Sequence, residues 1–218
     1  MVPRRPESPF GPSRRSLLTL PVFLGAERLA AAAKGGSTVR DKLWLWSHVA
    51  GSYNGKYNLP GKSRMTPAEA SFYMGIPNVF MIHLAGQPEP PLEQYALAFE
   101  PVREVVWGIV AAGGHTNLQE REMVLYLAMK NPKISGVVMD DFFRGKAEGK
   151  LASLTLEEVQ ALKQRLVKPG KKLDLWVVLY EHQLQAPITA HLKLCDVTQF
   201  WTWRAENLEQ LDSNFQKA

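Results

Sequence analysis

Six short apolar segments recur along this chain, and each is followed by a segment with the pattern of an amphipathic helix. The apolar segments are nearly continuous and rich in β-branched and aromatic residues, which is typical of strands covered on both faces in a parallel sheet. They are Lys42–Ser47, Asn78–His83, Glu104–Ala111, Ile134–Asp140, Leu173–Tyr180 and Asp196–Trp201. The alternation predicts an α/β fold of consecutive βα units joined by right-handed crossovers.

Helix-start signals stand between the apolar segments. Thr66 and Glu69 have the spacing of a capping box, with proline at the first helical position, and Thr155 and Glu158 repeat the same spacing. Asn117 is a further expected cap. After the capped segment at Thr66, we expect helices at Pro90–Phe99, Asn117–Lys130, Thr155–Val167, Pro187–Leu194 and Ala205–Phe215, the last with Leu208, Leu211 and Phe215 on one face.

The number of units favours an incomplete barrel. A full (βα)8 barrel needs about 250 residues, and six units fit the part of this chain that follows residue 36. We therefore predict that residues 37–218 form six of the eight βα units of a TIM-type barrel, truncated at its C-terminal end. No glycine-rich phosphate-binding turn follows the first strand, which argues against a dinucleotide-binding sheet. A complete six-stranded open sheet remains the alternative.

The N-terminal residues have the pattern of an export signal. Arg14 and Arg15 precede the apolar run Leu17–Ala26, and the small residues Ala31–Ala33 follow. This arrangement resembles a twin-arginine signal, and the apolar run is too short to span a bilayer. We expect residues 1–36 to be a leader and the mature chain to be exported from a bacterial cytoplasm, to the periplasm or the extracellular space.

The formal net charge of +5 also belongs to this region. Residues 1–40 contain seven basic and two acidic residues, so the remaining 19 basic and 19 acidic residues balance. A balanced domain has no excess charge to attract a polyanion. We expect no nucleic-acid partner and no membrane span.

Polar and aromatic residues gather at the ends of the expected strands. In a barrel these ends form one mouth, where the active site lies. Asp140, Asp141 and Glu181 are the candidate catalytic carboxylates. The candidate substrate-binding residues at the same ends are Trp46, His48, His83, His115, Tyr180, His182, Trp201 and Trp203, and Tyr53 and Tyr57 add aromatic faces nearby.

This combination of residue types suits the chemistry of sugars. A carboxyl group in an aromatic pocket has a raised pKa and serves as a general acid, and a second carboxylate serves as base or holds a substrate hydroxyl. Strand alternation should point one of Asp140 and Asp141 into the mouth and the other aside. Aromatic faces stack on the apolar faces of sugar rings.

The acidic strand end VVMDDFF and the aromatic strand end FWTW resemble those of glycoside-hydrolase-like (βα)8 domains over residues 41–218. The resemblance implies that Asp140 or Asp141 is the acid/base group, and that a nucleophile would come from a seventh strand that this sequence lacks. The DxxDxDxE run of chitinase-like members is absent. The resemblance therefore predicts a glycoside-hydrolase-like protein with a carbohydrate substrate.

Two other functions fit the same residues. The histidines and carboxylates together would suit a metal-dependent sugar isomerase or epimerase, although no HxH, HExxH or CxxC spacing supports a metal. We expect neither metal nor cofactor. An incomplete barrel would also suit a non-catalytic carbohydrate-binding protein. Whatever the function, an incomplete barrel would expose the open edges of its first and last strands, and we therefore expect the chain to self-associate.

Overall fold

The computed structural model describes residues 38–144 and 149–217 of the chain. The predicted export leader, residues 1–36, lies outside the described residues, so export of the chain remains a prediction. In the described ranges no helix is both long and apolar enough to cross a membrane.

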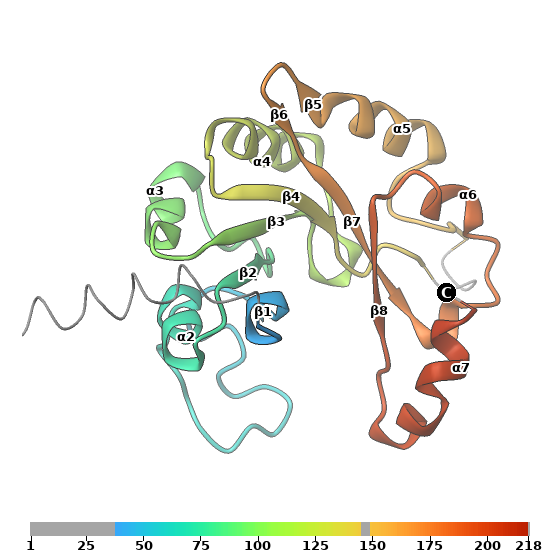
Figure 1. Ribbon diagram of the computed structural model, residues 1–218, viewed down its shortest axis with the longest axis horizontal. Coiled ribbons are helices and arrows are strands. Elements are labelled where there is room, and N and C mark those ends of the chain that lie inside the picture. Colours follow the sequence, from blue (N-terminus) through green and yellow to red (C-terminus); the bar gives the residue numbers. More distant parts are fainter. Residues whose placement is uncertain (1–37, 145–148, 218) are drawn as a thin grey trace, which may run out of the picture. The chain divides into compact units, whose positions relative to one another are not determined.

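Six parallel strands form one sheet that curls into a half-barrel, with the helices on its convex side (Figure 1). Each strand pairs with the strands before and after it in the sheet order β1-β2-β3-β4-β7-β8, which never reverses. A doubly wound sheet would need such a reversal. The strands are β1 (Trp44–Ser47), β2 (Asn78–Met81), β3 (Glu104–Val110), β4 (Ile134–Met139), β7 (Asp174–Tyr180) and β8 (Val197–Trp201). The predicted α/β class and the parallel sheet are confirmed.

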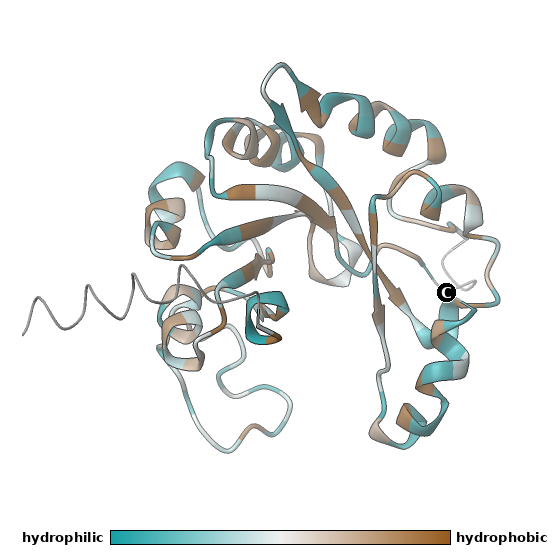
Figure 2. Cartoon of the chain, in the orientation of Figure 1, coloured by the Kyte–Doolittle hydropathy of each residue, from teal (hydrophilic) through white to brown (hydrophobic). Residues whose placement is uncertain are grey.

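The two faces of the sheet bury different side chains. Val79, Trp107 and Met139 belong to a large core beneath the helices, where they are fully buried. Phe80, Val106 and Val138 point the opposite way, into the hollow of the half-barrel. Figure 2 shows much brown along the strands, and turns of teal, white and brown along the surrounding helices. Continuous apolarity of the strands thus reflects burial on both faces.

Tryptophans fill the hollow and join the first strand to the last. Trp46 of β1 and Trp201 of β8 meet edge to face, with ring centroids 5.1 Å apart. Trp44 and Trp176 contact each other with tilted rings, 5.3 Å between centroids, and Gly136 leaves the room that Trp176 needs, because a Cβ there would lie 2.9 Å from its indole nitrogen. Strands β1 and β8 are not hydrogen-bonded to each other, so side chains alone link these two edges in the described sheet.

The helices begin where the capping signals predicted. Thr66 and Thr155 form complete capping boxes with Glu69 and Glu158, and the Asn117 side chain accepts a hydrogen bond from the Glu120 amide at 2.9 Å. The helices are α2 (Pro67–Met74), α3 (Leu92–Ala96), α4 (Leu118–Lys130), α5 (Leu156–Arg165), α6 (Thr189–Leu192) and α7 (Leu211–Phe215), with 3-10 turns η1 (Arg40–Lys42), η2 (Leu97–Phe99), η3 (Ala112–Gly114), η5 (Glu181–Gln183) and η6 (Ala205–Gln210).

Four of the expected helices differ in extent. Pro90–Phe99 is divided into α3 and the turn η2, and Pro187–Leu194 is shortened to α6. The expected helix Thr155–Val167 ends at Arg165, because the chain then turns at Pro169-Gly170 into a small antiparallel hairpin of β5 (Val167–Lys168) and β6 (Lys171–Lys172). The expected last helix is a 3-10 turn followed by α7, and its apolar residues are not buried. Leu208, Leu211 and Phe215 are 55%, 40% and 65% exposed.

Apolar side chains are also exposed at the other edge of the sheet. Phe72 and Tyr73 on α2 are 89% and 80% exposed. Both edge strands of the sheet therefore have an exposed apolar helix nearby (Figure 1). Self-association at these edges remains a prediction.

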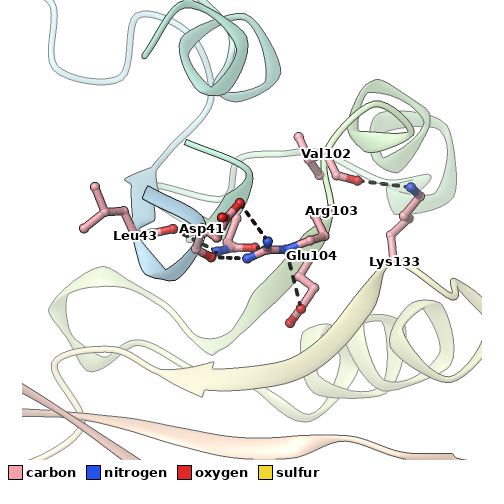
Figure 3. A network of polar contacts seen from close by, with 7 residues as sticks. Asp41, Leu43, Val102, Arg103, Glu104 and Lys133 are labelled. Carbon is pink, nitrogen blue, oxygen red and sulfur yellow. Dashed lines mark hydrogen bonds and ion pairs between the residues drawn. The ribbon is translucent and has the colours of Figure 1, made fainter. Parts of the chain in front are cut away.

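A polar network closes the amino-terminal ends of the first three strands (Figure 3). The Asn78 amide donates to the main-chain oxygens of Asp41 and Leu43, both at 2.9 Å. The Arg103 guanidinium donates to the Asn78 side chain at 3.1 Å and forms an ion pair with Asp41 at 3.3 Å. These contacts satisfy the buried Asn78 side chain at the end of the sheet that is remote from the candidate site, where such residues serve stability.

Candidate active site

A cavity of about 550 Å³ opens at the carboxyl ends of the strands. Its wall is formed by residues at the ends of β1, β4, β7 and β8 and in the loops after β1, β2 and β3. Of the sequence-predicted residues, the cavity brings together Trp46, His48, His115, Asp140, Asp141, Tyr180, Trp201 and Trp203. The size is typical of a small-molecule site.

Asp140 is the buried acid of this cavity. Strand alternation places it on the same face as Val138, toward the hollow of the half-barrel, and only 4% of the residue is exposed. Its Oδ1 accepts a hydrogen bond from the Asp141 amide at 2.9 Å. Burial, and then the neighbouring charge of Asp141, raise the pKa of Asp140 to about 7. Asp140 is therefore poised to hold or release a proton near neutral pH.

Asp141 lines the cavity as well, contrary to the expectation that one aspartate points aside. Its φ of 43° is left-handed, which is costly for a residue other than glycine and is often found at functional sites. Both carboxylate oxygens accept hydrogen bonds at 2.6 Å, Oδ2 from the Gly113 amide and Oδ1 from the Tyr180 hydroxyl. The turn of the backbone thus brings two consecutive carboxyl groups into one cavity.

The loop after β3 is shaped to meet Asp141. Gly114 has a φ of 65°, and a Cβ on it would lie 2.5 Å from the Asp141 carbonyl oxygen. The Gly114 carbonyl accepts hydrogen bonds from the Arg144 guanidinium and the Ser153 hydroxyl, both at 2.8 Å. Only glycine fits this close approach of two backbones, which sets the position of the Gly113 amide.

Tyr180 faces both aspartates. Burial raises the pKa of its hydroxyl, and the hydrogen bond to Asp141 raises that pKa further. The hydroxyl therefore stays protonated and acts as a fixed donor to Asp141. The Tyr180 ring stacks on the ring of His182 at 5.6 Å, and Trp203 meets it edge to face at the same distance.

His48 and Tyr53 form a second polar pair. The Ile82 carbonyl oxygen lies 3.2 Å from Nδ1 of His48. A carbonyl oxygen can only accept a hydrogen bond, so Nδ1 carries the proton, and Nε2 accepts a hydrogen bond from the Tyr53 hydroxyl at 2.8 Å. Burial lowers the pKa of His48 and raises that of Tyr53. Both groups are therefore neutral near pH 7. The Tyr53 oxygen keeps a lone pair that can accept a hydrogen bond from a ligand hydroxyl.

His83 does not line the cavity. It is buried, and its Nε2 accepts a hydrogen bond from the Trp107 indole at 2.8 Å. Burial lowers its pKa, so the neutral ring that accepts this bond is favoured. In this structure His83 supports the core beneath the helices rather than meeting a ligand in the cavity.

Glu181 also lies away from the cavity. It begins the turn η5, and its Oε1 accepts a hydrogen bond from the Asn207 amide. The other oxygen, Oε2, is buried without a hydrogen-bond partner among the described residues. Of the three candidate carboxylates, the cavity therefore brings together Asp140 and Asp141 alone.

The loops after β2 and β3 supply cavity residues that the sequence analysis did not identify. The Gly113 amide holds Asp141, and Leu84, Ala85 and Ala112 complete the wall. The available signal was the pair Gly113-Gly114 after an apolar strand, since adjacent glycines permit the two positive φ values observed.

No group of three His, Cys, Asp or Glu side chains in residues 38–144 and 149–217 is arranged to bind a metal ion. The chain matches no protein-family model, and neither the curated proteins nor the solved structures include a significant match to it.

Proposed function

We propose that this chain is a carbohydrate-active, glycoside-hydrolase-like protein whose half-barrel is an incomplete TIM-type barrel with six of the eight βα units. The observation that carries the proposal is the pair of aspartates in one aromatic-walled cavity at the strand ends, one of them buried with a pKa of about 7. Pairs of carboxyl groups with different environments divide the acid and charge-stabilising roles in glycoside hydrolysis.

In this proposal Asp140 is the general acid. It gives its proton to the glycosidic oxygen as the bond to the anomeric carbon breaks. Water then adds its hydroxyl to that carbon and returns a proton to the Asp140 carboxylate, so the site is restored. A pKa of about 7 keeps much of the acid protonated at neutral pH while leaving it strong enough to donate.

Asp141 is proposed to stabilise the positive charge that develops on the sugar ring. Its two hydrogen bonds hold it in place before the substrate binds, so no reorganisation is needed in the transition state. The exposed ring of Trp203 and the ring of Trp201 offer faces for sugar stacking, and the Tyr53 oxygen accepts from a hydroxyl.

The test incubates the full chain with a panel of soluble polysaccharides and measures the release of reducing ends. Asp140→Asn should lower the rate by about a hundredfold or more, the usual contribution of a general acid. Asp174→Asn is the matched control, because it makes the same chemical change at the opposite end of β7, where Asp174 pairs with Lys172 at 3.8 Å.

Equal activity of Asp140→Asn and Asp174→Asn would contradict the assignment of Asp140 as the general acid. If the wild-type chain binds a polysaccharide of the panel without cleaving it, and Asp140→Asn binds it equally well, the chain is a non-catalytic carbohydrate-binding protein instead.

A further inference from the structure

Two further cavities adjoin the central one through different walls. One of about 290 Å³ shares Asp141, Tyr180 and Trp203 with it. The other, of about 400 Å³, shares Trp46, His48 and Tyr53. The two have no lining residue in common. The central cavity, which alone contains Asp140, is therefore the middle one of three.

The smaller neighbour is walled by aromatic rings. His182 lies nearly parallel to the Tyr180 ring, with 13° between the planes. Trp203 stands almost perpendicular to Tyr180 and is 65% exposed. Rigid rings around an open cavity suit the apolar face of a sugar unit, which gains contact area at little cost in conformational entropy.

The larger neighbour is walled by the loop after β1. Asn54 pins this loop across its base, because its amide donates to the Ser63 carbonyl at 3.0 Å and its Oδ1 accepts from the Ser63 amide at 2.8 Å. Leu59 and Met65 add partly exposed apolar surface. The two hydrogen bonds close the loop between residues 54 and 63, and the residues of this loop form one wall of the larger neighbouring cavity.

We infer that the site binds a linear polysaccharide across the mouth of the half-barrel and cleaves linkages inside the chain. The inference rests on the proposed function and adds the substrate class to it. A chain that fills all three cavities has sugar units on both sides of the bond that faces Asp140. An enzyme that removes sugars from the end of a polysaccharide needs a site that is closed on one side of the catalytic carboxylates. Here a further cavity lies on each of two sides of the central cavity.

The first test compares two measurements on the wild-type chain acting on carboxymethylcellulose, xylan, galactomannan and laminarin. Internal cleavage lowers the viscosity of a polysaccharide steeply while few reducing ends have appeared. We expect this pattern for the polysaccharide that is hydrolysed. Release of single sugars, with viscosity falling only in proportion to the ends formed, would overturn the inference.

The second test blocks the larger neighbouring cavity. Gly61 lines it, has an ordinary φ, and a Cβ there meets no atom within 4 Å, so Gly61→Trp can place a bulky ring in the cavity without backbone strain. Gly61→Ala is the matched control. For oligosaccharides of the hydrolysed linkage, the kcat/KM ratio of hexasaccharide to disaccharide should fall about tenfold in Gly61→Trp relative to Gly61→Ala, equivalent to about 1.4 kcal/mol of lost binding.

An unchanged ratio in Gly61→Trp would overturn the inference while leaving the proposed hydrolase intact. Retained activity in Asp140→Asn would remove the proposed function, and this inference with it. Circular dichroism of both Gly61 variants confirms that the comparison is made on folded protein.

Discussion

The Tyr180 hydroxyl at the end of β7 donates a hydrogen bond of 2.6 Å to Oδ1 of Asp141, which follows β4. The bond joins two neighbouring strands at the mouth of the half-barrel. It also holds the carboxylate of Asp141 in place, and the charge of Asp141 helps to raise the pKa of Asp140. Loss of this single donor should therefore affect the chemistry more than the fold.

We expect Tyr180→Phe to lower kcat/KM by about tenfold to a hundredfold, because a hydrogen bond to a charged group contributes about 1.5–3 kcal/mol. Tyr73→Phe is the control, since Tyr73 is 80% exposed on α2 and outside the cavity. Steady-state kinetics on the hydrolysed substrate measure both. Equal kinetics of Tyr180→Phe and Tyr73→Phe would show that Asp141 needs no support from Tyr180.

The activity of the wild-type chain should decline at alkaline pH. Asp140 donates only when protonated, and its pKa is about 7. The logarithm of kcat/KM should therefore fall with a slope of about −1 per pH unit above pH 7. A pH–rate profile checks this expectation, and a profile that stays flat well beyond that pKa would rule out Asp140 as the acid.

The stability of the fold should depend on the same proton. The pKa of Asp140 rises from 3.8 to about 7 on folding, so the folded state binds the proton more tightly than the unfolded state. Between these two pH values the free energy of unfolding falls as pH rises, and below 3.8 Asp140 contributes no penalty.

Asparagine at this position cannot ionise and avoids the penalty. Asp140→Asn should therefore gain stability relative to wild type as pH rises, reaching about 4 kcal/mol above pH 7, with little difference near pH 4. Urea unfolding near pH 4 and above pH 7 measures this difference in the free energy of unfolding. Asp174→Asn is the control for loss of a carboxylate elsewhere in the chain. A difference that grows toward acid pH would contradict the assigned direction.

Gly114 should tolerate alanine poorly. Its left-handed φ is costly for alanine, and a Cβ would lie 2.5 Å from the Asp141 carbonyl oxygen. Gly170→Ala has a similar strain, with a φ of 79° and no atom near an added Cβ. Gly114→Ala should therefore lose about 1–3 kcal/mol more than Gly170→Ala. Thermal unfolding compares them, and equal losses would show that the loop can move away from Asp141.

Glu181→Gln should lower activity far less than Asp140→Asn does, because Glu181 lies outside the cavity. The same assay as for Asp140→Asn decides this. A loss of activity as large as that of Asp140→Asn would show that Glu181 is needed for catalysis, as its position at a strand end predicted.

Periodicity predicted the sheet well because both of its faces are buried. Where a strand is covered on one side by helices and on the other by Trp44, Trp46 or Trp176, every position must be apolar. The same logic fails for the last segment. Leu208, Leu211 and Phe215 have helical spacing, but spacing cannot tell whether an element exists for them to pack against.

The candidate site was predicted in part for a related reason. Strand order places the ends of β1, β4, β7 and β8 at one mouth, so Trp46, Asp140 and Tyr180 could be assigned together. Side-chain direction beyond the last strand residue depends on the turn that follows. Asp141 enters the cavity because its φ is 43°, whereas Glu181 starts a 3-10 turn that carries it away.

The edge-to-face contact of Trp46 with Trp201 has a consequence for how the chain folds. All strand pairings of the sheet join neighbours along the sequence, so structure can spread from one unit to the next with small losses of chain entropy. The two indoles instead come from opposite ends of the sheet, and their meeting requires every intervening unit to be in place. The contact between these two indoles should therefore form in the final event of refolding, later than the growth of helical circular dichroism.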